Sequence, residues 1–184
     1  MRKIIPFGFA VLSSLTVVYG QAKNIEADRR LSSITYHVYH IFHSVDGVSS
    51  EIFCSGQLDS ISHKLKLINV SANVLSFNSG NSSRDKTAMN AVDAEHYSQV
   101  VFQSDTINYV SDSTLFVVGK LSFHGITNEI SMPVSLNYES GTTDCEGGFE
   151  ANFSDYNVER PSIFFISIGN KFGIKFHIVF DSTF

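Results

Sequence analysis

The chain lacks several features that would point directly to a function. It contains no tryptophan and only two cysteines, and its 13 lysines and arginines against 18 acidic residues give a net charge of -5 over 184 residues. Two cysteines are too few for a disulfide scaffold, so an ordinary hydrophobic core must hold the fold. No basic run is longer than Arg29-Arg30, which excludes nucleic acid as the expected partner.

The N-terminus has the composition of an export signal. A basic start at Arg2-Lys3 precedes a mostly apolar stretch over residues 4–18 and small residues suited to cleavage. The apolar stretch is shorter than the ~20 residues that a membrane-spanning helix requires. We therefore expect cleavage of residues 1–22, no transmembrane span, and one periplasmic or secreted domain over residues 23–184.

Alternation of apolar and polar residues is the strongest pattern in the rest of the chain. It predicts a β-hairpin between Leu115 and Tyr138 with its turn at residues 123–127, and it is cleanest from Phe172 to Phe180. Further extended stretches are expected around residues 34–38, 52–56, 65–77, 100–102 and 149–153. With no βαβ rhythm, these strands predict an antiparallel sandwich or closed barrel.

Three local signals interrupt the strands. Asp46-Gly47 predicts a turn. A change of apolar parity between Leu67 and Ile68 indicates a β-bulge. One short helix is expected over residues 84–89, with Ser82 or Ser83 as its N-cap.

Four sequence motifs, in order along the chain, resemble those of YceI-like lipid-binding proteins. They are Ser32–His40, Asn81–Met89, Asp93–Phe102 and Gly119–Thr127. The resemblance implies an all-β fold, a lipocalin-like antiparallel β-barrel of about eight strands with one short helical insert. It also implies that the apolar lumen carries or sequesters a long-chain hydrophobic ligand such as an isoprenoid, an isoprenoid quinone or a fatty amide. No metal and no cofactor other than such a lipid is expected.

The inward-facing apolar residues of these strands are the expected lumen. They are Ile34, Tyr36, Val38, Leu121, Phe123, Met132, Val134, Leu136, Phe149, Phe153, Phe172, Ile174, Phe176 and Ile178. Sixteen phenylalanines and seven tyrosines must be kept from water somewhere. Burial of each methylene of a lipid tail gains about 0.8 kcal/mol. The alternative is that the same residues fill the barrel as an ordinary core.

Six residues of the family-like motifs are candidates for a polar or structural role: Arg84, Asp85, Met89, Asp93, His124 and Gly125. The three charged residues form either a head-group clamp or an ion-pair network that docks the helix, and we favour the network. For His124 we favour a hydrogen bond that holds the hairpin turn, because no Gly-x-Ser-x-Gly or His-Glu-x-x-His motif accompanies it. His37, His40 and His43 alternate in direction along a strand, so they are not expected to bind a metal together.

Several interpretations remain open from the sequence. The preferred function is non-catalytic lipid carriage; the alternatives are a lipid-modifying enzyme that uses His124 or Arg84-Asp85, and a ligand-free structural barrel. Cys54 and Cys145 form either one long-range disulfide or two buried thiols. A homodimer is compatible with the sequence.

Overall fold

The computed structural model describes residues 22–39, 44–139, 141–163 and 166–181. Ten strands form one antiparallel sheet in the order β1-β4-β5-β6-β7-β8-β9-β12-β2-β3. These strands are β1 (Ala22–Glu26), β2 (Ser33–Tyr39), β3 (Ser44–Ser49), β4 (Ile52–Asp59), β5 (Leu65–Asn73), β6 (Gln99–Ser111), β7 (Thr114–Phe123), β8 (Ile126–Glu139), β9 (Thr142–Asn152) and β12 (Lys171–Phe180). The remaining elements are the short pair β10 (Ser162–Ile163) and β11 (Ile166–Ser167), helix α1 (Ser82–Ala91), and the 3-10 turns η1 (Val74–Ser76) and η2 (Phe153–Tyr156).

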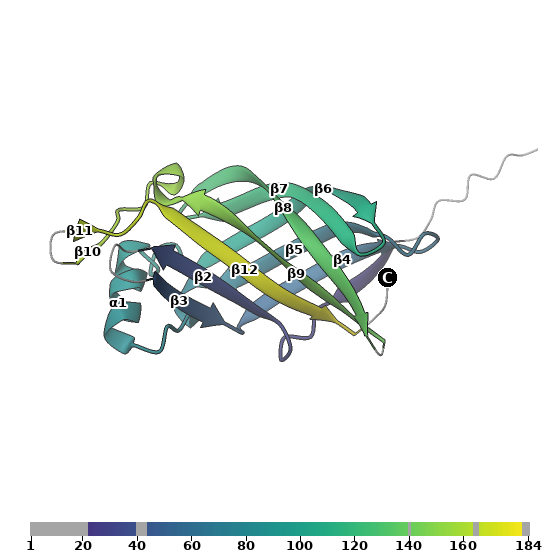
Figure 1. Cartoon of the computed structure of the whole chain (residues 1–184), viewed down its shortest axis with the longest axis horizontal. Helices are drawn as coiled ribbons and strands as arrows, with labels where there is room; N and C mark the ends of the chain where they lie inside the picture. The colour runs from purple at the N-terminus through teal and green to yellow at the C-terminus, as the bar shows by residue number, and fades with distance from the viewer. Residues whose placement is uncertain (1–21, 40–43, 140, 164–165, 182–184) are drawn as a thin grey trace, which may run out of the picture.

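The sheet curls into a barrel because isolated bridges join its two edges to the opposite side. Ala27, just after β1, pairs with Phe180 of β12, and Val48 of β3 pairs with Asn78, just after η1. The first bridge closes a ring of eight strands from β1 to β12, and the second closes a ring of eight from β5 through β12 to β3. The predicted all-β barrel of about eight strands is therefore confirmed, although its sheet contains ten strands. Figure 1 shows α1 and the β10–β11 pair at one end of the barrel and the end of β12 at the other.

Buried serine hydroxyls reinforce both closures. The Ser32 hydroxyl donates to the Asp28 carbonyl at 2.7 Å and accepts the Val179 N–H at 3.0 Å. The Ser49 hydroxyl lies 2.6 Å from that of Ser76, on the other closure. An isolated bridge provides few backbone hydrogen bonds, so these side chains satisfy polar groups that a continuous ladder would otherwise pair.

The predicted hairpin forms through a two-residue turn. Phe123 pairs with Ile126, and the intervening His124 and Gly125 have φ angles of 50° and 75°. Two successive left-handed residues are typical of the turn that matches the right-handed twist of two strands. A Cβ atom on Gly125 would lie 2.8 Å from Cε1 of Tyr97, so glycine is required both by conformation and by space.

The predicted turn at Asp46-Gly47 is wrong, because both residues lie within β3. The ring of Tyr36 on the neighbouring strand covers Gly47, where a Cβ would lie 2.3 Å from Cε1 of the ring. Glycine here makes room for an aromatic ring on the next strand, a frequent reason for glycine inside a strand. Neither β1 nor β3 was expected from the sequence.

The bulge in β5 lies earlier than predicted. Pairing is unbroken from Gln57↔Leu67 through Gly56↔Ile68, whereas the next pair, Leu58↔Leu65, leaves Lys66 as the extra residue. The bulge explains the change of apolar parity that the sequence shows, but it precedes Leu67 instead of following it.

Helix α1 is longer than predicted and has a different cap. It begins at Ser82, and the side chain of Asn81 accepts the Arg84 N–H at 3.0 Å, so Asn81 is the N-cap in place of Ser82 or Ser83. Within the part of the chain that the structure describes, no helix has the length and apolar character needed to cross a bilayer. Of the predicted export signal, residues 1–22, only Ala22 lies among the described residues.

Candidate binding cavity

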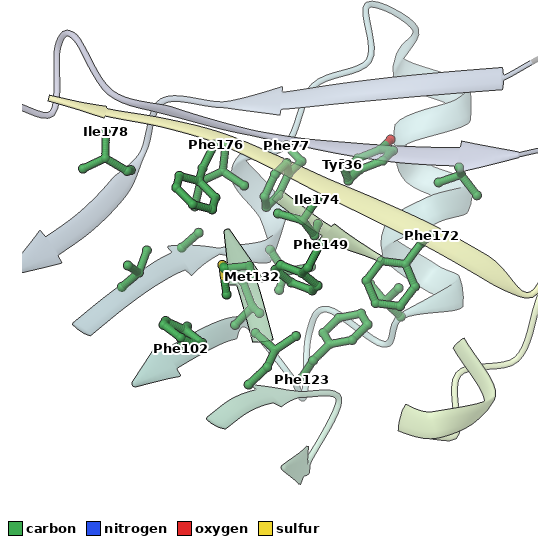
Figure 2. A pocket seen from close by; sticks show the side chains of 18 of the residues that line it. Tyr36, Phe77, Phe102, Phe123, Met132, Phe149, Phe172, Ile174, Phe176 and Ile178 are labelled. Atoms are coloured by element: carbon green, nitrogen blue, oxygen red, sulfur yellow. The ribbon is translucent and has the colours of Figure 1, made fainter. Parts of the chain in front are cut away.

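An apolar cavity of about 250 Å³ runs inside the barrel, and Figure 2 shows ten labelled residues of its wall. Thirteen of the fourteen residues predicted for the lumen line it: Ile34, Tyr36, Val38, Leu121, Phe123, Met132, Val134, Phe149, Phe153, Phe172, Ile174, Phe176 and Ile178. A filled barrel would leave no such space, since protein interiors pack with few voids larger than a water molecule. The cavity therefore has the character of a ligand site, which is concave and mostly apolar.

Much of the opposite wall was not predicted from the sequence. Further lining residues come mainly from β4–β7 and the segment after β5, and include Cys54, Leu65, Ile68, Val70, Ala72, Val74, Phe77, Val100, Phe102, Leu115 and Val117. The alternation in β5 and β7 contained this signal, since residues of equal parity in a strand face the same side. Of the described residues that line the cavity, Arg160 alone is charged.

Aromatic rings surround the end of the cavity near α1, which we call the mouth. The ring of Phe172 lies 4.8 Å from that of Phe153 and 6.0 Å from that of Phe123, measured between centroids. Four α1-proximal residues, Ala88, Met89, Ala91 and Val92, reach the cavity here. The charged group of Arg160 donates to the Ile168 carbonyl at 3.2 Å, so at this end the apolar wall borders a fixed positive charge.

The opposite end, which we call the inner end, is closed by packed side chains. Leu115 and Phe180 line the cavity and are each about 1% exposed, while Ile25, Leu58 and Leu136 are buried but do not line it. Leu136, which the sequence predicted for the lumen, is buried but is not among the described residues that line this cavity. Leu136 faces inward as expected and pairs with Cys145 on the neighbouring strand. Its side chain belongs to the packed hydrophobic core.

The two cysteines line the inner half of the cavity as free, buried thiols. Burial raises the pKa of the Cys54 thiol, and the nearby Cys145 raises it further. Burial likewise raises the pKa of Cys145 to about 12. Both groups are consequently neutral near pH 7 and behave as small hydrophobic side chains.

Polar residues of the α1 motif hold a loop and do not form the predicted ion-pair network. The Arg84 guanidinium donates to the Ser79 hydroxyl at 2.9 Å and to the Ser79 carbonyl at 2.7 Å. The Asp85 carboxylate accepts the Ser79 N–H at 3.0 Å and also the Ser79 hydroxyl. No salt bridge joins Arg84 to Asp85 or Asp93 among the described residues. Ser79 takes up the hydrogen bonds of Arg84 and Asp85 instead.

Tyr36 connects this polar group to the cavity. Its ring lines the cavity and packs against Phe77 at 5.6 Å between centroids. Burial raises the pKa of Tyr36, and the charge of Asp85 adds to the shift. The tyrosine is therefore a neutral hydroxyl at the boundary between the apolar wall and the polar residues beside α1.

Asp93 lies apart from this group. It has a φ of 46°, and its carboxylate is 2.7 Å from Nδ1 of His96. Its carbonyl accepts the backbone N–H groups of His96 and Tyr97. Asp93 thus shapes the turn after α1 and does not meet Arg84 and Asp85 at a common site.

His124 fixes the hairpin to the neighbouring 3-10 turn. Its Nδ1 lies 2.8 Å from the carbonyl oxygen of Tyr156, and its ring packs against Tyr97 at 4.5 Å between centroids. The hydrogen bond therefore goes to η2 and not to the hairpin turn itself. None of His124, Arg84 and Asp85 is among the described residues that line the cavity.

The three histidines that share a spacing of three fall partly outside the described residues. His40 and His43 lie in the undescribed stretch 40–43. His37 faces the Asp46 carboxylate on the adjacent strand β3. No group of three or more possible metal ligands gathers among the residues that the structure describes.

The chain resembles known proteins both in sequence and in structure. A UPF0312 protein of Pseudomonas putida is 25% identical over 165 residues, which cover 84% of each chain. One from Pseudomonas syringae pv. tomato is 26% identical over 162 residues, covering 86% of this chain and 76% of that protein. Among solved structures, Burkholderia cenocepacia BcnA matches with a TM-score of 0.74 and 21% identity, covering 83% of this chain and 98% of BcnA.

A polyisoprenoid binding domain from Saccharophagus degradans matches with a TM-score of 0.64 and 11% identity, covering 86% of this chain and 98% of that domain. At such low sequence identity, these structural matches show a shared fold. The sequence model of the YceI-like domain matches residues 26–180, which is most of the chain. The chain therefore belongs to the YceI-like domain family.

Proposed function

We propose that this protein binds and carries a long-chain polyisoprenoid lipid, without chemically changing it. The observation that carries this proposal is the cavity, a continuous apolar space that is closed at the inner end and bordered by polar residues at the mouth. Ten buried methylenes would supply about 8 kcal/mol before the cost of ordering the tail is subtracted. The S. degradans domain, which shares this fold, is a polyisoprenoid binding domain.

The cavity is long enough to hold an extended lipid tail. Phe172 and Phe180 of β12 both line it. These residues are separated by about 26 Å of extended strand, or roughly 20 Å along a barrel axis to which strands tilt by about 40°. One leaflet of a bilayer is about 15 Å of hydrocarbon, half of the ~30 Å core, so a lipid tail that spans a leaflet fits within this length.

The positions of the polar motif residues support carriage over catalysis. His124 is engaged with the Tyr156 carbonyl, and Arg84 and Asp85 are engaged with Ser79. A catalytic group must lie within hydrogen-bond reach of the reacting atoms. None of these three side chains is among the described residues that line the cavity, and that lining is almost entirely apolar.

We also propose that the carrier works outside the cytoplasm. Support comes from the basic and then apolar N-terminal segment, which has the pattern of a secretory signal. Determining the N-terminal residue of protein recovered from the periplasm or medium tests this: a mature chain beginning near residue 23 is expected, and recovery of uncleaved protein in the cytoplasm would contradict it.

The binding proposal is tested by extracting lipid from the purified protein and by reloading delipidated protein with polyprenols. Mass spectrometry should find about one long-chain lipid per chain. Ala72→Phe places a ring in the lumen and should abolish loading, because Ala72 is 2% exposed and lines the cavity. Ser71→Phe, one residue away and on the other face of β5, is the matched control and should load normally. Equal loading of the two variants, or an empty wild type that never reloads, would refute the proposal.

A further inference from the structure

Cys54 and Cys145 have no assigned role, yet both line the inner half of the cavity. They come from β4 and β9, which are not neighbours in the sheet, so their side chains approach from different walls. Both are free and buried. Since their thiols are protonated and shielded from solvent, what they contribute to a binding site is shape and not reactivity.

Their neighbours show what shape they provide. Cys145 is paired with Ile178 on one side and Leu136 on the other. Ile178 lines the cavity, whereas Leu136 does not. Cys145 therefore lies near the inner end of the cavity, which Phe180 also lines, and Leu136 on the neighbouring strand belongs to the packed core.

Larger side chains lie in the same hydrophobic cluster as the two cysteines. Leu65, Leu115, Ile178 and Phe180 line the same region. A cysteine side chain has fewer heavy atoms than any of these, so the two cysteines leave the space that a chain terminus needs. Interiors tolerate added volume poorly, so enlarging either side chain would take that space directly from a bound tail.

We propose that Cys54 and Cys145 form the terminal pocket of the tunnel and set the longest tail that the protein accepts. This inference rests on the proposed function and adds a specificity determinant to it. A tail longer than the tunnel would leave apolar carbons outside the mouth, each forfeiting the transfer free energy of a buried methylene. The position of the packed inner end therefore determines which tail lengths the protein selects.

The test loads delipidated wild-type protein and variants with an equimolar mixture of polyprenols of defined lengths and reads the bound species by native mass spectrometry. Cys145→Phe should lower the ratio of the longest bound polyprenol to the shorter ones at least tenfold. Cys145→Ala keeps the space and should leave the ratio within twofold of wild type. Glu146→Phe adds the same ring on the outer face of β9 and should also leave it unchanged.

A second variant shifts the limit the other way and remains informative if Cys145→Phe does not fold. Leu136→Ala removes a large side chain beside Cys145 and should shift the bound polyprenols toward longer species. An unchanged length distribution in folded, loaded Cys145→Phe or Leu136→Ala would overturn the terminal pocket alone. Wild-type protein that binds none of the polyprenols would overturn lipid carriage itself, and the pocket with it.

Discussion

The inner end and the mouth of the barrel are built on different principles. At the inner end, Leu58, Leu115 and Phe180 are each 1–2% exposed and belong to one hydrophobic cluster. At the mouth, helix α1 has no buried residue, and Phe153 and Phe172 belong to a second, aromatic cluster. Left-handed backbone occurs there at Gly80, Asp93, His124, Gly125 and Asn157, whereas at the inner end only the turn residues His63 and Gly141 among the described residues adopt it.

Because of this difference, we expect the inner end to contribute more to the stability of the fold and the mouth to open more easily. A close-packed end supplies most of the free energy that opposes unfolding, because large buried side chains are the costliest to remove. An end with an exposed helix and several strained turns opens at lower cost, as binding elements generally must. Under the proposed function, a lipid would enter at the mouth, and the inner end would limit the length of its tail.

The largest expected effect is the loss of a side chain at the inner end. Phe180→Ala should lower the free energy of unfolding by about 3–5 kcal/mol, because a fully buried ring leaves a cavity. Urea unfolding followed by circular dichroism measures this. A loss under about 1 kcal/mol would mean that the inner end is not the stable part of the barrel.

A backbone change at the mouth should cost less. Gly125→Ala should destabilise by about 1–2 kcal/mol, because alanine is strained at positive φ and its Cβ would press against the ring of Tyr97. The same unfolding experiment compares it with Phe180→Ala. If Gly125→Ala proved the more damaging of the two, the contrast between the ends would be lost.

Removing a polar contact at the mouth should have a still smaller effect. His124→Asn keeps a residue that tolerates left-handed backbone but loses the bond to the Tyr156 carbonyl, a cost of about 1 kcal/mol. Polyprenol loading should stay within twofold of wild type. Complete loss of loading in a folded variant would instead place His124 in the binding machinery.

The smallest effect concerns the exposed pair of Asp93 and His96. The hydrogen bond that the His96 imidazole donates to the Asp93 carboxylate raises the pKa of His96. A raised pKa in the folded state means that the contact stabilises the turn below pH ~6.5 and that its contribution is lost as pH rises through the folded pKa. Titration of the imidazole by NMR should give a lower pKa for His96 in Asp93→Asn than in wild type. An identical pKa would show that the pair does not form in solution.

The direction of most lumen residues could be predicted from sequence, but their depth could not. Parity along a strand is local, and it assigned Phe172, Phe176 and Ile178 to the cavity correctly. The same rule placed Leu136 in the lumen, although it packs in the core beside Cys145. Depth depends on where the opposite walls meet, and no single strand contains that information.

The polar motif shows a similar limit. Arg84, Asp85 and Asp93 are close in sequence, which favoured a local ion-pair network. In the structure the first two hold Ser79, and Asp93 turns away to His96. Which partner an exposed charge finds depends on the loop folded against it, because local charge pairs gain only a fraction of a kcal/mol.

By itself, the sequence determined that the chain forms antiparallel strands with one apolar face, because side-chain alternation is a property of each strand. It also determined a tight hairpin at His124-Gly125, since few residues accept two successive left-handed conformations. Only the tertiary structure decided that ten strands close into rings of eight and that the lumen stays hollow between the mouth and Cys145. Closure and hollowness depend on how distant strands meet, and that is fixed by the packing of the whole sheet.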